Sequence, residues 1–303
     1  MSSLCYLVSN PINITSGNII IEGVYANIRE EETFNGSPGY EQGNDTYNNV
    51  LSCLYTKSDI AILNFATTVT HPIQIRNIDF RGTDYKGNAI LFGSTFRGPT
   101  WPFIVEYCHF KGFNRAIYLD TNNVLSYNVH KFVVRNCGFV ENKMCIDFGS
   151  CLSYDIDIYN NCMHHNERHL RINSSQSVVN IYNNNFEGYH TTGTSPLYNY
   201  LINITLYHGA DLNFYNNYFE ANNSDLINII NKRYSSVIEK KPAILNLYSN
   251  TYIGIASGVK SVTIGDELSS LYELSQADCD IHIIAGTLIM DKIYKDLYIG
   301  GTS

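Results

Sequence analysis

An eight-residue pattern recurs seven times along this chain, and it limits the possible folds more than any other feature of the sequence. Each copy begins with alternating apolar and polar residues, turns at a position that is usually Asn, and ends on an aromatic residue or Met. The central apolar residues of successive copies lie 23 to 33 residues apart. A repeat of this length is typical of a solenoid whose units pack only on their neighbours. The copies are Ile73–Phe80, Phe103–Phe110, Phe132–Phe139, Ile156–Met163, Val179–Phe186, Leu212–Phe219 and Leu245–Tyr252.

A second apolar segment follows each of the first six copies. These segments are Ala89–Phe92, Ala116–Leu119, Cys145–Phe148, His169–Ile172, Ile202–Ile204 and Leu226–Ile229. Two strands and two or three turns per period leave no room for a crossover helix, so successive copies must pair in parallel, about 4.8 Å apart. The sequence therefore predicts an all-β fold, a single-stranded parallel β-helix of about 8–10 coils.

Equivalent residues of successive coils form ladders in such a stack. The last residue of each copy predicts an aromatic ladder in the interior. Cys108 and Cys137 occupy an inward position, where stacked side chains are too far apart for a disulfide, so we expect both to be buried thiols. We also expect an Asn ladder that hydrogen bonds to the turns and to itself. Its members are Asn136, Asn160, Asn183 and Asn216.

Composition and charge exclude several classes of protein. With 44% hydrophobic and 16% charged residues, the chain has enough apolar material for a core. Its net charge of -8 has the wrong sign for phosphate backbones, so we expect no nucleic-acid partner. The first basic residue is Arg29, and no apolar run approaches the roughly 20 residues of a membrane span. We therefore expect neither a signal peptide nor membrane insertion.

The cysteines and short motifs point to no cofactor. The eight cysteines have neither CxxC spacing nor the density of a disulfide scaffold, which predicts free thiols and folding in a reducing cytosol. No P-loop, GxGxxG or cofactor-lysine motif occurs. We divide the chain into a β-helix over 1–255 with polar insertions at 29–49 and 189–200, and a cap or oligomerisation segment over 256–303.

The repeated Ile-x-Ile-Tyr-Asn-Asn-x-Phe-x-Gly pattern and the opening Ile19-Ile-Ile-Glu-Gly23 resemble right-handed parallel β-helices of the pectate-lyase type. The resemblance covers about residues 7 to 255 and is greatest to phage tailspike and capsule-depolymerase proteins. It implies a right-handed coil and a homotrimer that binds and often cleaves bacterial surface polysaccharide. It also implies a place in the virion tail, outside the cell, after folding in the cytoplasm. The coils begin almost at Met1, so we expect either a fragment or a chain that docks onto another virion tail protein.

Outward residues of neighbouring coils fall into columns, and four carboxylates in these columns are candidate catalytic groups. Glu187 and Glu220 share a turn position in adjacent coils, with backbones about 5 Å apart, near the carboxyl separation of retaining glycosidases. One of the two would have its pKa raised by the other and could act as a proton donor. Asp147 lies one coil from Arg171, and Asp157 lies beside the first column. The alternatives are solvated turn glutamates and a simple salt bridge.

The first outward column combines charge and aromatic residues. It begins with Arg76, Glu106 and Arg135, which we interpret as a surface ion-pair ladder. It continues with tyrosines that could offer flat faces and hydroxyl groups to sugars, or could simply stabilise the stack. These substrate-binding candidates are Tyr159, Tyr182 and Tyr215.

A His-rich segment, His164-His-Asn-Glu-Arg-His169, provides further candidates. It lacks the helical HExxH order, and neighbouring His on a strand should point in opposite directions, so we expect no metal site. We expect His169 to point the same way as Arg171 and, with His165, to contact substrate. In a polysaccharide lyase, one of these His would be the base and Arg171 would neutralise a uronate carboxylate. Tyr159 or Tyr182 would be the acid.

The sequence thus predicts a tailspike-like protein that depolymerises a bacterial surface polysaccharide by endo-glycosidic hydrolysis. A lyase on the same scaffold and a non-catalytic glycan-binding spike or structural adhesin are the alternatives.

Overall fold

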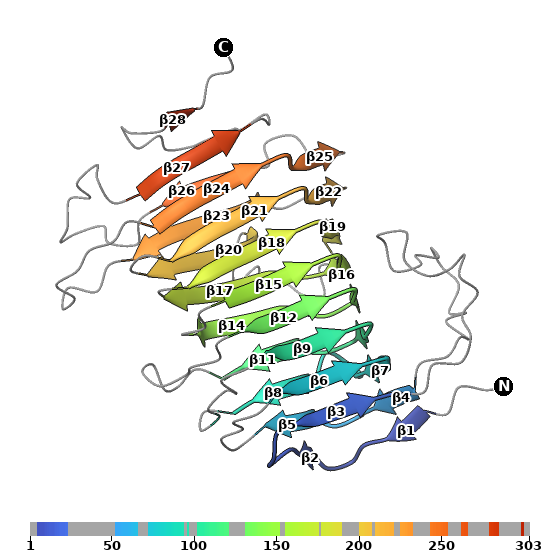
Figure 1. The fold of residues 1–303 in the computed structure, drawn as a ribbon. Coiled ribbons are helices and arrows are strands. Elements are labelled where there is room, and N and C mark those ends of the chain that lie inside the picture. Colours follow the sequence, from blue (N-terminus) through green and yellow to red (C-terminus); the bar gives the residue numbers. More distant parts are fainter. Residues whose placement is uncertain are drawn as a thin grey trace.

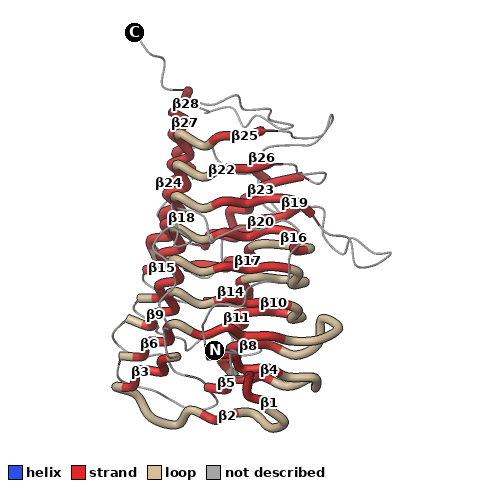
Figure 2. The backbone as a smooth tube through the Cα atoms, turned by 90° about the vertical axis from the view of Figure 1, so that its right-hand side faces the viewer, coloured by secondary structure: helices blue, strands red, loops and turns tan. Residues whose placement is uncertain are grey.

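The computed structural model describes most of the chain between Cys5 and Ile299. The described residues are 5–23, 52–65, 72–93, 96, 102–120, 131–151, 155–175, 177–189, 200–207, 210–220, 225–232, 243–253, 262–265, 279–284 and 298–299. Within them every regular element is a β-strand. The strands stack in coils along one axis from the N-terminal to the C-terminal end (Figure 1), and the side view shows the coils as successive rungs (Figure 2).

The strands form three parallel sheets, of nine, nine and ten strands in the described residues. Sheet A contains β1 (Cys5–Leu7), β4 (Ser52–Tyr55), β7 (Ile78–Arg81), β10 (His109–Lys111), β13 (Gly138–Val140), β16 (Cys162–Asn166), β19 (Asn185–Tyr189), β22 (Tyr218–Glu220) and β25 (Thr251–Ile253). Sheet B contains β2 (Ile12–Asn13), β5 (Ala61–Phe65), β8 (Asn88–Phe92), β11 (Arg115–Leu119), β14 (Ile146–Cys151), β17 (Leu170–Ser175), β20 (Tyr200–Tyr207), β23 (Asp225–Lys232) and β26 (Val262–Gly265). Sheet C contains β3 (Ile19–Glu22), β6 (Ile73–Arg76), β9 (Phe103–Glu106), β12 (Phe132–Arg135), β15 (Asp155–Tyr159), β18 (Val178–Tyr182), β21 (Asp211–Tyr215), β24 (Ala243–Tyr248), β27 (Cys279–Ile284) and β28 (Tyr298–Ile299).

Each repeat copy spans a corner of the coil. In the copy Ile73–Phe80, the first four residues form β6 in sheet C, Asn77 makes the bend, and the rest begins β7 in sheet A. The second apolar segment of that coil lies in β8 of sheet B. Equivalent strands pair in parallel at every step of the described stack. The predicted single-stranded parallel β-helix is confirmed.

The interior contains the predicted aromatic ladder. The rings of Phe80 and Phe110 stack with centroids 5.1 Å apart, and those of Phe110 and Phe139 with centroids 4.8 Å apart. Met163 takes the next position and Phe186 follows, and both side chains are fully buried. Because the apolar area removed from water recurs in every coil, each coil adds its own hydrophobic stabilisation.

The buried Asn ladder lies one residue later than predicted. Asn136, Asn160, Asn183 and Asn216 are the bend residues themselves, with φ between 53° and 54°, in the left-handed region that Asn tolerates best among residues with a side chain. This bend turns the next residue inward, so the second Asn of each turn is the buried one. The ladder comprises Asn161, Asn184, Asn217 and Asn250.

The side chain of Asn184 illustrates how this ladder satisfies the corner. Its Oδ1 accepts from the backbone N–H of Asn161 at 3.0 Å, and its Nδ2 donates to the backbone carbonyl of Ile158 at 2.9 Å and to Oδ1 of Asn217 at 3.0 Å. The same contacts recur one coil later at Asn217. Backbone groups that the bend removes from the strand ladder therefore find partners inside the protein.

The corner between sheets A and B uses the same device. Glu141 and His165 adopt φ values of 52° and 54°, and each is followed by a fully buried Asn. Asn142 donates its backbone N–H to Oδ1 of Asn166 at 2.8 Å, and each side-chain amide donates to a carbonyl of the preceding coil.

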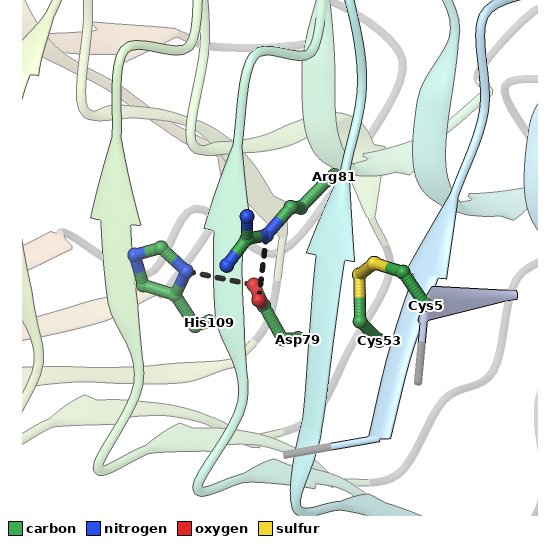
Figure 3. The surroundings of a disulfide bond; sticks show 5 residues. All are labelled: Cys5, Cys53, Asp79, Arg81 and His109. Atoms are coloured by element: carbon green, nitrogen blue, oxygen red, sulfur yellow. Dashed lines mark hydrogen bonds and ion pairs between the residues drawn. A yellow bond between two sulfur atoms is a disulfide. The ribbon is translucent and has the colours of Figure 1, made fainter. Parts of the chain in front are cut away.

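The cysteines follow the prediction only in part. Cys108, Cys137, Cys145 and Cys162 are free and buried, as expected. Cys5 and Cys53 instead form a disulfide, so the expectation of free thiols throughout was wrong (Figure 3). The register places them directly opposite each other on β1 and β4, with Cα atoms 4.3 Å apart. Their separation of 48 residues gives no spacing signal in the sequence.

The predicted insertion at 29–49, and all of the insertion at 189–200 except its first and last residues, lie outside the described residues. Within 256–303, β26 pairs with β23, and β27 pairs with β24. The described part of this segment therefore extends the solenoid, and the rest of the predicted cap lies outside the described residues.

We predict that Asn184→Ala lowers the free energy of unfolding by about 2 to 5 kcal/mol, because it leaves buried backbone groups of the corner without partners. Urea unfolding followed by circular dichroism measures the change. Asn183→Gly is the matched control, since φ of 54° suits Gly, and should change the stability by less than about 0.5 kcal/mol. Equal effects of the two variants would show that the inward Asn is not the structural one.

Candidate functional site

The outer faces of the three sheets carry the predicted columns. On sheet A the column is Lys111, Val140, His164, Glu187 and Glu220. On sheet B it is Leu91, Tyr118, Asp147, Arg171, Asn203 and Asn228. On sheet C it is Arg76, Glu106, Arg135, Tyr159, Tyr182 and Tyr215. The register of the parallel strands thus brings together residues that are far apart in the sequence.

Glu187 and Glu220 form an asymmetric carboxylate pair on sheet A. They lie directly opposite each other on β19 and β22. Burial raises the pKa of Glu187 above its usual value, and the charge of Glu220 raises it further, while His165 acts in the opposite direction. Glu220 accepts a hydrogen bond from the Tyr218 hydroxyl at 2.9 Å. Glu187 is therefore the carboxyl of the pair that is disposed to hold a proton, and Glu220 is the one that accepts a hydroxyl hydrogen bond.

Two His side chains border this pair in the preceding coil. His164 lies opposite Glu187, and its Nδ1 is 3.0 Å from Nδ1 of His165. The expectation that these neighbours point in opposite directions was wrong, because the left-handed φ of His165 breaks the strand alternation. Burial lowers the pKa of His164 to about 3, and the charge of His165 adds to the effect. His164 is thus a neutral hydrogen-bonding group at ordinary pH.

A second acid–base pair on sheet A escaped the sequence analysis. Nδ1 of His109 lies 2.9 Å from Oδ1 of Asp79, and Nε of Arg81 donates to Oδ2 at 2.7 Å (Figure 3). Burial opposes ionisation of Asp79, but the hydrogen bond and charge of His109 and the charge of Arg81 outweigh it and lower the pKa. Asp79 and His109 both occupy the seventh position of the repeat in adjacent coils. Aligning the copies at that position would have predicted the contact from the sequence.

Asp147 on sheet B is held by two arginines. Arg171 donates through Nε and Nη2 to its two oxygens at 2.6 and 2.7 Å, and Arg115 donates through Nε at 2.7 Å. Only 2% of the Asp147 side chain is exposed. The predicted contact with Arg171 is confirmed, whereas Arg115, which belongs to the preceding coil, was missed. A carboxylate whose two oxygens both accept from guanidinium groups is poorly placed to attack a substrate.

His169 does not lie on the outer face. Its side chain is fully buried, with its ring centroid 5.5 Å from that of Phe186. The expectation that it points outward with Arg171 was wrong, because His169 lies in the bend before β17, where period-two alternation does not apply. Burial lowers its pKa to about 3. His169 therefore cannot contact a bound sugar in this conformation.

Asp157 begins a polar ladder on sheet C. It forms an ion pair with Lys131 at 3.0 Å and accepts from Nδ2 of Asn180 at 2.7 Å. The amides continue the ladder, from Asn213 to Asn180 at 2.9 Å and from Asn246 to Asn213 at 2.8 Å. Within the described residues, the contacts of Asp157 are those of a structural ion pair at the end of an amide ladder.

The tyrosines of sheet C stack on one another rather than offering their faces. The ring centroids of Tyr159 and Tyr182 are 4.8 Å apart with planes 6° apart, and those of Tyr182 and Tyr215 are 5.0 Å apart with planes 1° apart. Both faces of the Tyr182 ring, and one face each of Tyr159 and Tyr215, are therefore covered by neighbouring rings. Ring edges and hydroxyl groups remain for a ligand, and Tyr159 already accepts from Nη1 of Arg135 at 2.9 Å.

The ion-pair ladder predicted before these tyrosines is confirmed between Glu106 and Arg135, where it is less exposed than expected. Glu106 is only 4% exposed and lies 2.6 Å from Nη2 of Arg135. Gln74 also donates to Glu106. Arg76 pairs with Glu22 of the preceding coil at 2.9 Å.

Among the described residues, no group of three or more His, Cys, Asp and Glu could hold a metal ion. In the described part of the chain, no helix is long and apolar enough to cross a membrane. Comparison with protein-family models, with curated proteins and with solved structures gave no match. The functional inference therefore depends on the geometry described above.

We predict that His169 makes the fold acid-sensitive. Above pH 6.5, His169 is neutral in both the folded and unfolded states; below it the unfolded state binds a proton, and the folded state does not until about pH 3. Stability is thus lost as the pH falls, by about 2 kcal/mol between pH 7.5 and 5.0. Urea unfolding at both pH values measures the difference in the free energy of unfolding. In His169→Phe, this difference should be smaller than in the unmodified protein by about 2 kcal/mol. An unchanged difference would contradict the prediction.

Proposed function

We propose that this chain binds a bacterial surface polysaccharide along the outer face of sheet A and cleaves it by endo-glycosidic hydrolysis. The observation that carries the proposal is the asymmetry of Glu187 and Glu220. The first is partly buried with a raised pKa, and the second accepts the Tyr218 hydroxyl. Glycoside hydrolysis uses two neighbouring carboxyl groups, one of which is a proton donor of raised pKa.

In the proposed reaction, Glu187 donates its proton to the glycosidic oxygen as the bond between that oxygen and the anomeric carbon breaks. The Glu220 carboxylate attacks the anomeric carbon and forms a glycosyl ester. Water then attacks the ester, losing its proton to Glu187, and Glu220 is released as a carboxylate. Adjacent parallel strands are about 4.8 Å apart, close to the roughly 5 to 5.5 Å carboxyl separation of retaining enzymes.

The other candidate carboxylates suit this role less well. Both oxygens of Asp147 accept from arginines, and Asp157 is paired with Lys131. The lyase alternative loses one of its two candidate bases, because His169 is buried. His165 is exposed, so that alternative keeps this candidate base.

The bacterial substrate, the homotrimer and the place in a virion tail beside another tail protein rest on the resemblance of the repeat to phage tailspikes. We expect the purified chain to sediment as a trimer at micromolar concentration. Sedimentation equilibrium measures this directly, and a monomer across the accessible concentration range would overturn the trimer proposal without affecting the assignment of Glu187 and Glu220.

We predict that Glu187→Gln and Glu220→Gln each lower the rate of polysaccharide cleavage by about 100- to 10,000-fold while binding is retained, because each removes a proton donor or a charged carboxylate. The assay incubates the protein with a panel of capsular and O-antigen polysaccharides and follows polymer length and new reducing ends. Glu141→Gln is the matched control, since Glu141 is a surface carboxylate paired with Lys111, and its rate should be unchanged.

Three outcomes would redirect the proposal. Shortening accompanied by the ultraviolet absorbance of a new double bond would replace hydrolysis with β-elimination. Cleavage that survives in both Gln variants would remove Glu187 and Glu220 from the reaction. Binding of a glycan without any shortening would leave a non-catalytic spike.

That non-catalytic reading is the second candidate, and one observation favours it. The tyrosine hydroxyl groups of sheet C run beside the amide ladder of Asn180 and Asn213. Together these hydroxyl and amide groups form a regular hydrogen-bonding array. The array includes no carboxyl group of raised pKa that could donate a proton. Such a surface can bind a polymer of hydroxyl groups without cleaving it.

A further inference from the structure

Arg115 is held rigidly while its terminal amino groups remain available. Its Nε donates to Oδ2 of the buried Asp147 at 2.7 Å. Its guanidinium carbon lies 4.3 Å from the centroid of the Tyr118 ring. The side chain is nevertheless 33% exposed. Within the described residues, neither of its terminal nitrogens donates a hydrogen bond.

Two other arginines use their terminal nitrogens, whereas Arg81, like Arg115, contacts its carboxylate through Nε alone, to Oδ2 of Asp79 at 2.7 Å. Arg135 uses Nε and Nη2 on Glu106 and Nη1 on Tyr159. Arg171 uses Nε and Nη2 on Asp147. Arg115 contacts its carboxylate through Nε alone, so its two NH₂ groups form the part of the guanidinium fork that matches a carboxylate in bidentate geometry.

Pre-organisation makes this fork a better anchor than a mobile surface arginine. Ordering an arginine on binding costs side-chain entropy, and here the contacts with Asp147 and Tyr118 have already imposed the order. Arg171 offsets the charge of Asp147, so Arg115 contributes a positive charge beyond that pair. Asp120 accepts a hydrogen bond from the Tyr118 hydroxyl at 3.3 Å, and its negative charge formally balances the positive charge of Arg115. Recognition therefore depends on the fork geometry more than on net charge.

We propose that Arg115 anchors the carboxylate of an acidic sugar on the outer face of sheet B. This inference deepens the proposed function by naming a substrate class, a polysaccharide that contains a uronic acid. The subsite lies on β11, several coils from Glu187 and Glu220 on β19 and β22. It therefore contributes to binding and to the choice of polymer and takes no part in bond cleavage.

The test uses protein labelled with ¹⁵N-arginine and follows the Nε–Hε resonances during titration with glucuronate. Methyl glucoside is the neutral counterpart, and glucose 6-phosphate is a second anion. We expect glucuronate to shift the Arg115 signal saturably at millimolar concentration, methyl glucoside to leave it in place, and glucose 6-phosphate to bind no more tightly than glucuronate. Asp120→Asn should tighten glucuronate binding severalfold, because it removes the neighbouring negative charge.

Two variants separate this site from non-specific anion binding. Arg115→Ala should abolish the saturable response of the remaining resonances near Asp147. Arg81→Lys is the matched control, because Arg81 pairs with Asp79 on another sheet, and it should leave the response unchanged. Glucuronate that causes no saturable shift, or an equal response after Arg115→Ala, would overturn the proposal. Tighter binding of glucose 6-phosphate would overturn the carboxylate assignment.

The outcome is independent of the cleavage assay. Loss of glucuronate binding with cleavage intact would sink the Arg115 subsite and leave Glu187 and Glu220 untouched. Glucuronate binding in a protein that cleaves no polymer would support the subsite and reject the proposed hydrolysis.

Discussion

A left-handed backbone bend at the corner between sheets C and A is the constraint on which the rest of this structure depends. At the corner between sheets C and A, the bend residue has a positive φ in successive coils, from Asn77 to Ser249. Most of these residues are Asn, and Tyr107 tolerates the same conformation at an expected cost of about 1 to 2 kcal/mol. Each bend turns the following side chain inward, where Asn161, Asn184 and Asn217 satisfy the backbone. Because every coil bends at the same place, the three sheets keep one register.

That register determines the chemistry of the outer faces. Three carboxyl groups illustrate the effect, since each is flanked by whatever the neighbouring coils place beside it. Asp79 lies beside His109 and is held ionised. Asp147 lies between two arginines, which offset its negative charge. Glu187 has another carboxylate as its neighbour, and its pKa is raised. Carboxyl groups of similar chemistry thus differ in their surroundings because their positions in the stack differ.

The regular part of the repeat was predictable from the sequence. The alternation in Val179–Phe186 and its equivalents gave the strands, the interior aromatic ladder and the outward columns, and the structure confirms all three. The errors fall where alternation stops. The Asn ladder was misplaced by one residue because Asn183 takes a left-handed φ. His165 and His169 were misoriented for a related reason, since one is a bend residue and the other precedes a strand.

Contacts between coils were beyond the reach of sequence reasoning. The disulfide between Cys5 and Cys53 joins residues that are 48 positions apart, and Arg115 reaches Asp147 from the neighbouring coil. The sequence by itself determined the solenoid and the face on which most side chains lie, because backbone periodicity is local. Only the tertiary structure decided which charges meet, which rings cover one another and which carboxyl group has a raised pKa. These outcomes depend on burial and on side-chain reach between coils, and neither is written into the spacing of residues along the chain.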